Sequence, residues 1–313
     1  MLGLSAVIVA ADESSAYVLA TRHGGDATGL PHGLFDPAGH RTFELGLRDW
    51  VQAQTGFEPG YVEQLYTFGD RGRELPRADL AEAPADARHI SVGYLGLAPE
   101  RPDTTGFDAI WRDWYDYFPW EDHRGGRPQM IDTTLAPLLM DWANAGGAAA
   151  PRRVNRASAA FGLNGAPWLE ERTLERYELL YECGVAPEAA RDETVEDAPR
   201  LPASIIGAPM LSDHRRILAT AIGRLRGKIK YRPVVFELAP DRFTLFQLQQ
   251  TVESILGGLL HKQNFRRALD KSGLVEATGQ FETSTGGRPA EYYRYRRGEH
   301  ALGGVIGVAT PRK

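Results

Sequence analysis

The sequence predicts an α+β protein in two parts. Residues 1–230 are expected to form an α/β/α sandwich with a helical insertion at about 130–205, and residues 231–313 a smaller unit of helices and a hairpin. Three observations support this prediction. The length of 313 residues is about twice that of a typical domain, apolar runs near the N-terminus alternate with turns, and helical periodicity dominates later.

The N-terminal part alternates strand patterns with one amphipathic helix. Four apolar runs predict strands: Leu4–Ala11, Ala16–Ala20, Gln64–Thr67 and His89–Leu97. After a Gly/Pro-rich loop, the periodicity of Phe43–Gln54 predicts a helix that Gly56 ends. Its buried side is expected to carry Leu45, Trp50 and Val51. Helical periodicity then returns from Thr134 to Tyr181, and a basic helix is predicted over 213–230.

Composition excludes several classes of protein. Apolar residues make up 42% and charged residues 25%, as in ordinary globular chains. The single cysteine, Cys183, cannot form an internal disulfide, which excludes a disulfide scaffold and favours a reducing cytoplasm. The first apolar run stops at Asp12-Glu13 without a basic leader, and no stretch approaches the ~20 apolar residues of a membrane span. We therefore expect a cytoplasmic protein with no membrane partner.

Charge is distributed unevenly along the chain. From Leu201 onward there are 18 Lys/Arg against 9 Asp/Glu, whereas the first 200 residues carry 18 against 32. An acidic body with a basic C-terminal part indicates that this end binds a polyanion.

The C-terminal part has the pattern of a helix-turn-helix followed by a hairpin. Thr244 is a favourable N-cap for a first helix that Gly257-Gly258 ends, and His261–Lys271 forms a second helix that stops at Gly273. Leu274–Thr278 is expected to pair with Ala290–Arg296. The second helix of such a motif can enter the major groove of DNA, and a basic hairpin can reach the minor groove.

The candidate DNA contacts are basic or amide side chains of types that bind phosphates or base edges. They are Arg242, Thr244, Lys262, Gln263, Asn264, Arg266, Arg267, Arg288, Arg294 and Arg296. A Lys in the first turn of a helix opposes the macrodipole, so Lys262 favours an anionic partner. The alternative is a solvated basic helix and hairpin that only stabilise the fold or a dimer.

The loop and helix that end at Gly56 have the shape of the Nudix motif, in which Glu residues of the helix bind catalytic Mg²⁺. Here the paired-Glu positions hold Ala53 and Gln54, the Arg-Glu positions hold Asp49 and Trp50, and the earlier Glu is Arg41. An amide cannot supply ionised oxygen to a metal. We therefore predict no metal site, no cofactor and no hydrolysis.

The chain resembles the Nudix-related transcriptional regulators of NAD metabolism, in particular a longer branch of alphaproteobacterial type. The N-terminal similarity lies in Gln64–Asp70 and Ile90–Tyr94. The stronger similarity covers about the last hundred residues and rests on these motifs: Arg224-Leu225-Arg226-Gly227-Lys228, Tyr231-Arg232-Pro233, Phe236-Glu237-Leu238, Phe243-Thr244-Leu245, Lys262-Gln263-Asn264-Phe265-Arg266-Arg267 and Gly273-Leu274-Val275. Typical members carry Asp where this chain has His261, so the cap of the second helix is expected to be weaker here.

The resemblance implies a Nudix-like sandwich joined to a winged helix-turn-helix. It implies a homodimer that represses NAD biosynthesis genes from a palindromic operator in double-stranded DNA, and an effector such as ADP-ribose, NAD or ATP. The candidate effector contacts are Arg22, His23, Phe35, Asp36, Arg41, Arg48, Phe68 and Asp70. The helix over 213–230 leads through Tyr231-Arg232-Pro233 into the winged helix, and we expect it to carry the effector signal.

Two alternatives remain open at this stage. One is an active Nudix hydrolase of ADP-ribose-like substrates with an accessory nucleic-acid domain, and the other is a Nudix-related regulator of sugar catabolism. The aromatic segment Trp111–Arg127 is more typical of a core or a dimer interface than of a base-stacking wall. The sequence assigns no role to the helical insertion.

Overall fold

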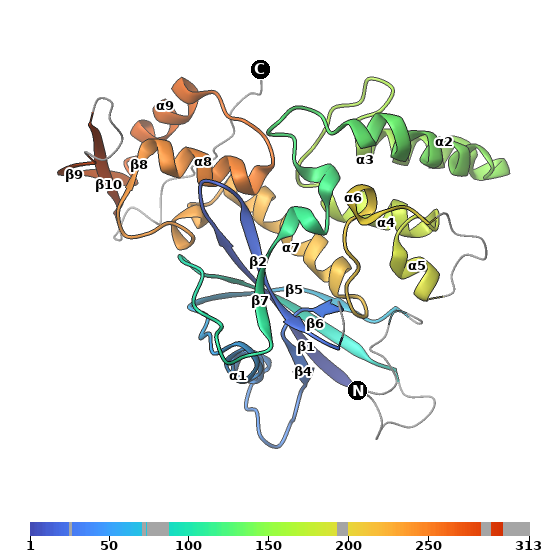
Figure 1. Cartoon of the computed structure of the whole chain (residues 1–313), viewed down its shortest axis with the longest axis horizontal. Coiled ribbons are helices and arrows are strands. Elements are labelled where there is room, and N and C mark those ends of the chain that lie inside the picture. The colour runs from blue at the N-terminus through green and yellow to red at the C-terminus, as the bar shows by residue number, and fades with distance from the viewer. Residues whose placement is uncertain (25–26, 71–72, 74–87, 193–199, 283–288, 297–313) are drawn as a thin grey trace.

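The computed structural model describes residues 1–24, 27–70, 73, 88–192, 200–282 and 289–296 (Figure 1). A mixed sheet lies at the centre of the N-terminal part, and a three-stranded sheet closes the C-terminal part. No helix of the described ranges is both long and apolar enough to cross a membrane.

The central sheet has seven strands. They are β1 (Leu2–Ala11), β2 (Ala16–Arg22), β3 (Thr28–Gly29), β4 (His32–Leu34), β5 (Tyr61–Phe68), β6 (Ile90–Leu97) and β7 (Ala109–Asp113). The order is β3-β2-β1-β6-β5, with β4 paired to β1 and β7 to β2. β1 and β6 run parallel, with Leu2 opposite Ile90, and the other pairs are antiparallel. The four predicted strands are confirmed.

Helices cover both faces of this sheet, which confirms the predicted sandwich (Figure 1). Leu4, Ile8 and other alternate residues of β1 pack in one core with Leu47 and Val51 of α1 (Phe43–Thr55). Val7, Val9 and Ala11 of β1 point to the other face and pack in a second core with α7 (His214–Ile229). The predicted burial of Leu45 is wrong, because its side chain is 47% exposed on the outer side of α1.

The insertion is a layer of short helices beside α7 (Figure 1). Its elements, with the turns that lead into it, are η2 (Trp114–Asp116), η3 (Pro119–Glu121), η4 (Ile131–Leu135), α2 (Ala136–Asn144), η5 (Gly147–Ala149), α3 (Ala150–Phe161), α4 (Thr173–Glu182), α5 (Pro187–Arg191) and α6 (Ala203–Ile206). Trp114, Tyr117, Phe118 and Trp120 are fully buried, so the aromatic segment belongs largely to the core.

The C-terminal part follows α7 without a long linker. It contains η6 (Val234–Glu237), β8 (Phe243–Thr244), α8 (Leu245–Leu256), α9 (Lys262–Ser272), β9 (Val275–Glu282) and β10 (Ala290–Tyr295). The strand order is β8-β10-β9. The predicted helices and hairpin are confirmed, and β9 extends four residues beyond the predicted Thr278.

Candidate functional site

The two helices α8 and α9 are fixed by local hydrogen bonds and by the core. Thr244 and Gln247 form a capping box at the start of α8, and Gly257 ends the helix in the left-handed conformation. The carboxylate of Glu253 accepts hydrogen bonds from the backbone N–H of Leu260 (2.8 Å) and from Gln249 (2.8 Å), which holds the turn. The buried side chains of α9 are Phe265 and Leu269.

The outer face of α9 presents three cations. Lys262, Arg266 and Arg267 are exposed, and none of them forms an ion pair with the described residues. Gln263 is exposed beside them, and Asn264 is half-buried. A helix face with three uncompensated cations and an amide is suited to phosphates and base edges.

The first turn of α9 is also open to an anion. His261 occupies the N-cap position but makes no side-chain cap hydrogen bond, so the expected weakening of the cap is confirmed. The first backbone N–H groups of a helix have no partner within the helix and bind phosphate well.

The cations of the hairpin are arranged differently. Arg294 and Arg296 are exposed, and both pair with Glu276 at 2.6 and 3.1 Å. Arg242 donates to Gln280 across the same sheet at 2.5 Å. These side chains line an open cavity of about 940 Å³ on the outer face of the three-stranded sheet.

Thr244 and Arg288 are also predicted DNA contacts. Thr244 is 3% exposed and its hydroxyl accepts the N–H of Gln247, so the structure gives it a capping role and we remove it from the interface. Arg288 lies outside the described residues.

The C-terminal unit is similar to known DNA-binding domains. Residues 235–295 match the family described as "NrtR DNA-binding winged helix domain". The C-terminal unit is therefore similar to the winged helix domain of NrtR-type regulators. It is also similar to a protein of Acinetobacter baylyi named "ADPR responsive transcriptional repressor NtrR", with 43% identity over 83 residues, or 26% of this chain. The match spans 33% of that relative's length.

The overall fold is similar to that of Shewanella oneidensis NrtR. The chain superposes on the crystal structure of Shewanella oneidensis NrtR with a TM-score of 0.54 and 19% identity, covering 94% of both chains. The same protein in complex with a 27mer DNA gives a TM-score of 0.56 at 18% identity, covering 98% of both. A MutT/nudix family protein from Enterococcus faecalis gives 0.53 at 16%, covering 95% of this chain and 88% of that one. The N-terminal part of the chain is therefore Nudix-like in fold.

In this Nudix-like domain, two residues at positions where the sequence analysis expects the Nudix carboxylates fasten α1 to β4. The amide of Gln54 exchanges two hydrogen bonds with the backbone of His32, at 3.0 and 2.6 Å. The indole of Trp50 donates to the carbonyl of Leu34 at 3.0 Å, and Ala53 is exposed. Among the described residues, no three His, Cys, Asp or Glu side chains are placed to hold a metal ion.

Most predicted effector contacts lie near one edge of the central sheet, where β1 begins; we call it the sensor edge. Phe68 of β5 pairs with Ser91 of β6, and Ser91 pairs with Gly3 of β1. Phe35 follows β4, which ends beside Gly3. His23 lies 5.4 Å from His32, ring centre to ring centre, and His32 is opposite Ser5.

Not all of these predicted contacts are free. Asp70 pairs with Arg216, Arg48 pairs with Glu44, and Phe68 is buried. Arg22, Asp36 and Arg41 are exposed, and Phe35 packs edge-on against Phe43. Arg41 lies in the loop that follows Phe35, but Arg48 lies on α1 and donates to the carbonyls of Pro59 and Gly60. The structure therefore does not gather all eight residues in one pocket.

Sequence reasoning found His23 but missed His32, His89 and His214 at the same edge. His214 starts α7, lies 4.7 Å from His32, and accepts the backbone N–H of Leu30 at 3.0 Å. His89 packs against Gly3, where a Cβ atom would lie 2.3 Å from the ring. The only sequence signal was the Asp213-His214 pair at the start of the basic helix, to which no role was assigned.

These histidines predict an acid-sensitive fold. Burial lowers the pKa of His89 to about 4, helped by the N-terminal ammonium and His32, and burial also holds the pKa of His214 well below 6.5. Between pH 6.5 and about 4 the unfolded chain therefore binds protons that the folded chain excludes, so stability falls as the pH is lowered. Urea midpoints measured across this range should fall, and H89F should reduce the slope.

Asp213 provides the control for this measurement. Burial raises the pKa of its carboxyl to about 6, a shift that contributes the opposite slope over much of the same range. D213N should therefore make the acid-induced loss of stability steeper. A flat profile in the wild-type protein would contradict the assignment of neutral histidines.

The winged helix is held directly against the Nudix-like domain at the end of α8. The hydroxyl of Tyr115 donates to the carbonyl of Ser254 (2.8 Å), Arg226 donates to that of Ile255 (2.8 Å), and the N–H of His123 donates to that of Gly257 (2.7 Å). The hydroxyl of Ser254 donates in turn to the carbonyl of Asp12 (2.8 Å). Carbonyls that a helix end leaves unpaired are thus satisfied by the other domain.

A buried ionic cluster lies behind this contact. Glu121 accepts hydrogen bonds from Arg176 of α4 and from Arg226 of α7, and all three side chains are 0–1% exposed. Burial alone would raise the pKa of Glu121, but the two guanidinium groups overcome it and hold the pKa below its ordinary value. Since Arg176 belongs to the insertion, one role of the insertion is to complete this cluster.

Proposed function

We propose that the chain is a DNA-binding transcriptional repressor whose Nudix-like domain senses ADP-ribose or another adenine nucleotide of NAD metabolism. The observation that carries the proposal is the face of α9, where Lys262, Arg266 and Arg267 form no ion pair with any described residue, in a domain similar to the NrtR winged helix. The relative from Acinetobacter baylyi is named a repressor responsive to ADPR.

The proposed assembly is a homodimer on a palindromic operator that controls NAD biosynthesis genes in the cytoplasm. Two copies of α9 would then occupy successive major grooves, which lie ~34 Å apart. The NrtR fold has been crystallised with a 27mer DNA, which is long enough for two such half-sites. Cross-linking in the presence of DNA should capture two protomers per duplex.

We propose that the effector binds at the sensor edge, with Arg22, His23, Phe35, Asp36 and Arg41 as contacts. Arg22 and Arg41 are exposed and have no ion pair with the described residues, so both are available to a diphosphate. Thermal-shift titration with ADP-ribose should raise the melting temperature, because a ligand that binds only the folded state stabilises it. R22A with R41A should abolish that rise, whereas R112A with R152A on distant elements should not.

We further propose that this Nudix-like domain does not turn over its ligand. Gln54 and Trp50 are committed to the backbone of β4, and neither can supply an ionised oxygen to Mg²⁺. ADP-ribose incubated with Mg²⁺ or Mn²⁺ should therefore yield no AMP above background. Metal-dependent AMP release that increases with protein concentration would instead support a hydrolase.

The contact at the end of α8 gives the effector a direct route to the DNA. Removing the side-chain hydrogen bonds with Y115F and S254A should weaken the response of DNA binding to ADP-ribose, while each ligand still binds. An insertion of Gly/Ser residues after Lys230 tests the other route, through residues 231–233. If only the insertion uncouples ADP-ribose binding from DNA binding, the signal travels through residues 231–233.

A further inference from the structure

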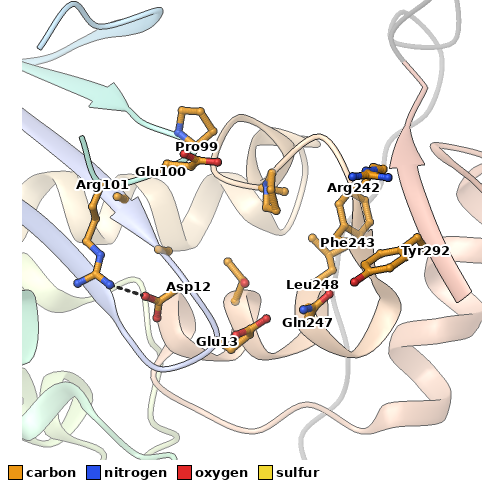
Figure 2. Close-up of a pocket in the computed structure, with 15 residues that line it drawn as sticks. Asp12, Glu13, Pro99, Glu100, Arg101, Arg242, Phe243, Gln247, Leu248 and Tyr292 are labelled. Atoms are coloured by element: carbon orange, nitrogen blue, oxygen red, sulfur yellow. Dashed lines mark hydrogen bonds and ion pairs between the residues drawn. The ribbon is translucent and has the colours of Figure 1, made fainter. Parts of the chain in front are cut away.

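A cavity of about 460 Å³ lies between the two domains, at the end of β1 opposite the sensor edge (Figure 2). The Nudix-like domain supplies the β1–β2 turn and residues 99–101, and the winged helix supplies β8, the first turns of α8 and Tyr292. The volume is within the range of small-molecule sites, which are frequent at domain interfaces. This cavity shares no residue with the candidate effector contacts.

The wall from the Nudix-like domain carries free negative charge. Glu13 and Glu100 have no hydrogen-bond or ion-pair partner among the described residues. Asp12, by contrast, is already satisfied, because it accepts the N–H groups of Ser14 and Ser15 (2.8 and 3.0 Å) and pairs with Arg101 (3.1 Å). Two carboxylates therefore remain available to a cationic group of a ligand.

The wall from the winged helix carries the opposite charge. Arg242 is exposed and commits one nitrogen to Gln280, which leaves N–H donors available to a ligand. Figure 2 shows Arg242 and Tyr292 on one side of the cavity and Asp12 on the other, with Glu100 on the upper wall and Glu13 on the lower wall. The rest of the wall mixes apolar residues with the polar side chains of Gln247 and Thr251. The apolar residues are Ala10, Ala11, Pro99, Ala239, Pro240, Phe243 and Leu248.

We propose that this interdomain cavity is a second ligand site, and that it binds a small zwitterion. An organic cation would lie against Glu13 and Glu100, and a carboxylate or phosphate would bind Arg242, with an apolar or aromatic spacer between them. An anion without the cation would face two unpaired carboxylates, and a cation alone would leave Arg242 unpaired. Charge complementarity at both ends therefore selects ligands that carry both groups.

Occupancy of the site affects DNA binding in two ways. Both domains form the walls of the cavity. The hydrogen bond from Ser254 to Asp12 lies one helical turn beyond Thr251, which lines the cavity. A bound ligand therefore changes the spacing between α8 and the β1–β2 turn. A ligand anion also occupies Arg242, which is a candidate DNA contact. The ligand therefore lowers the affinity for DNA.

Calorimetric titration of the full chain with nicotinamide mononucleotide tests the proposal, because this probe carries a pyridinium cation and a phosphate on one small frame. Ribose 5-phosphate lacks the cation and nicotinamide riboside lacks the phosphate, so each should bind at least tenfold more weakly. E13Q with E100Q, and separately R242Q, should each weaken binding of the probe at least tenfold.

Two controls locate the binding event. E58Q removes an exposed carboxylate elsewhere, and R22A with R41A alters the sensor edge, so both should leave binding of the probe unchanged. The proposal is overturned if the probe does not bind, if ribose 5-phosphate binds equally well, or if only R22A with R41A weakens binding. Because this assay contains no DNA, its failure would leave the proposed repressor function intact.

Discussion

Replacing Glu121 with alanine is expected to lower the free energy of unfolding by about 3–5 kcal/mol, the cost of leaving buried charge unpaired. Without this carboxylate, Arg176 and Arg226 would face each other in the interior with no anion between them. Urea denaturation of the variant and the wild-type protein measures the difference. It should appear as a lower midpoint with an unchanged slope.

A matched control separates the buried cluster from an ordinary ion pair. Glu182 pairs with Arg156 at 2.6 Å, but both side chains are more than a third exposed, so E182A should cost less than about 1 kcal/mol. Replacing all three buried residues together, as E121L with R176M and R226M, should recover much of the loss because no charge is left unpaired. Equal costs for E121A and E182A would contradict the role assigned to the cluster.

Replacing Lys262, Arg266 and Arg267 together with alanine is expected to weaken specific DNA binding about 100-fold or more, at ~1 kcal/mol or more for each contact. The slope of log affinity against log salt should also become shallower by about 2.7, since each lost phosphate contact removes roughly 0.9. Fluorescence anisotropy of a labelled duplex across a salt series measures both quantities.

The control for this triple variant removes the same charge elsewhere. Arg112, Arg152 and Arg200 are exposed on other elements, and their joint replacement with alanine should leave both the affinity and the salt slope nearly unchanged. If the two triple variants weaken binding equally, net charge and not the α9 face carries the interaction.

Features that depend on local pattern could be predicted from the sequence. The periodicity of Phe43–Gln54, the cap at Thr244 and the stop at Gly273 each involve residues within a few positions of one another, and the structure places α1, α8 and α9 accordingly. The outward face of α9 followed from the same periodicity. The burial of Thr244 did not, because its environment includes β10, which is almost fifty residues away.

Features that need distant segments to meet could not be predicted. Glu121, Arg176 and Arg226 come from three separate elements, and the interdomain cavity needs both domains in place. One signal was present, since Arg226 lies between the buried residues Leu225 and Ile229 of an apolar helix face. A charge at such a position indicates a buried partner, but periodicity does not say which residue it is.

The most direct test of the central proposal is one binding titration with and without effector. A palindromic duplex selected from a random pool by the full chain is titrated by anisotropy at 150 mM salt, first alone and then with ADP-ribose at saturation. We expect specific binding with two protomers per duplex and an affinity at least tenfold weaker with ADP-ribose. Selection that yields no preferred duplex, or an affinity that ADP-ribose leaves unchanged, would contradict an ADP-ribose-sensing repressor.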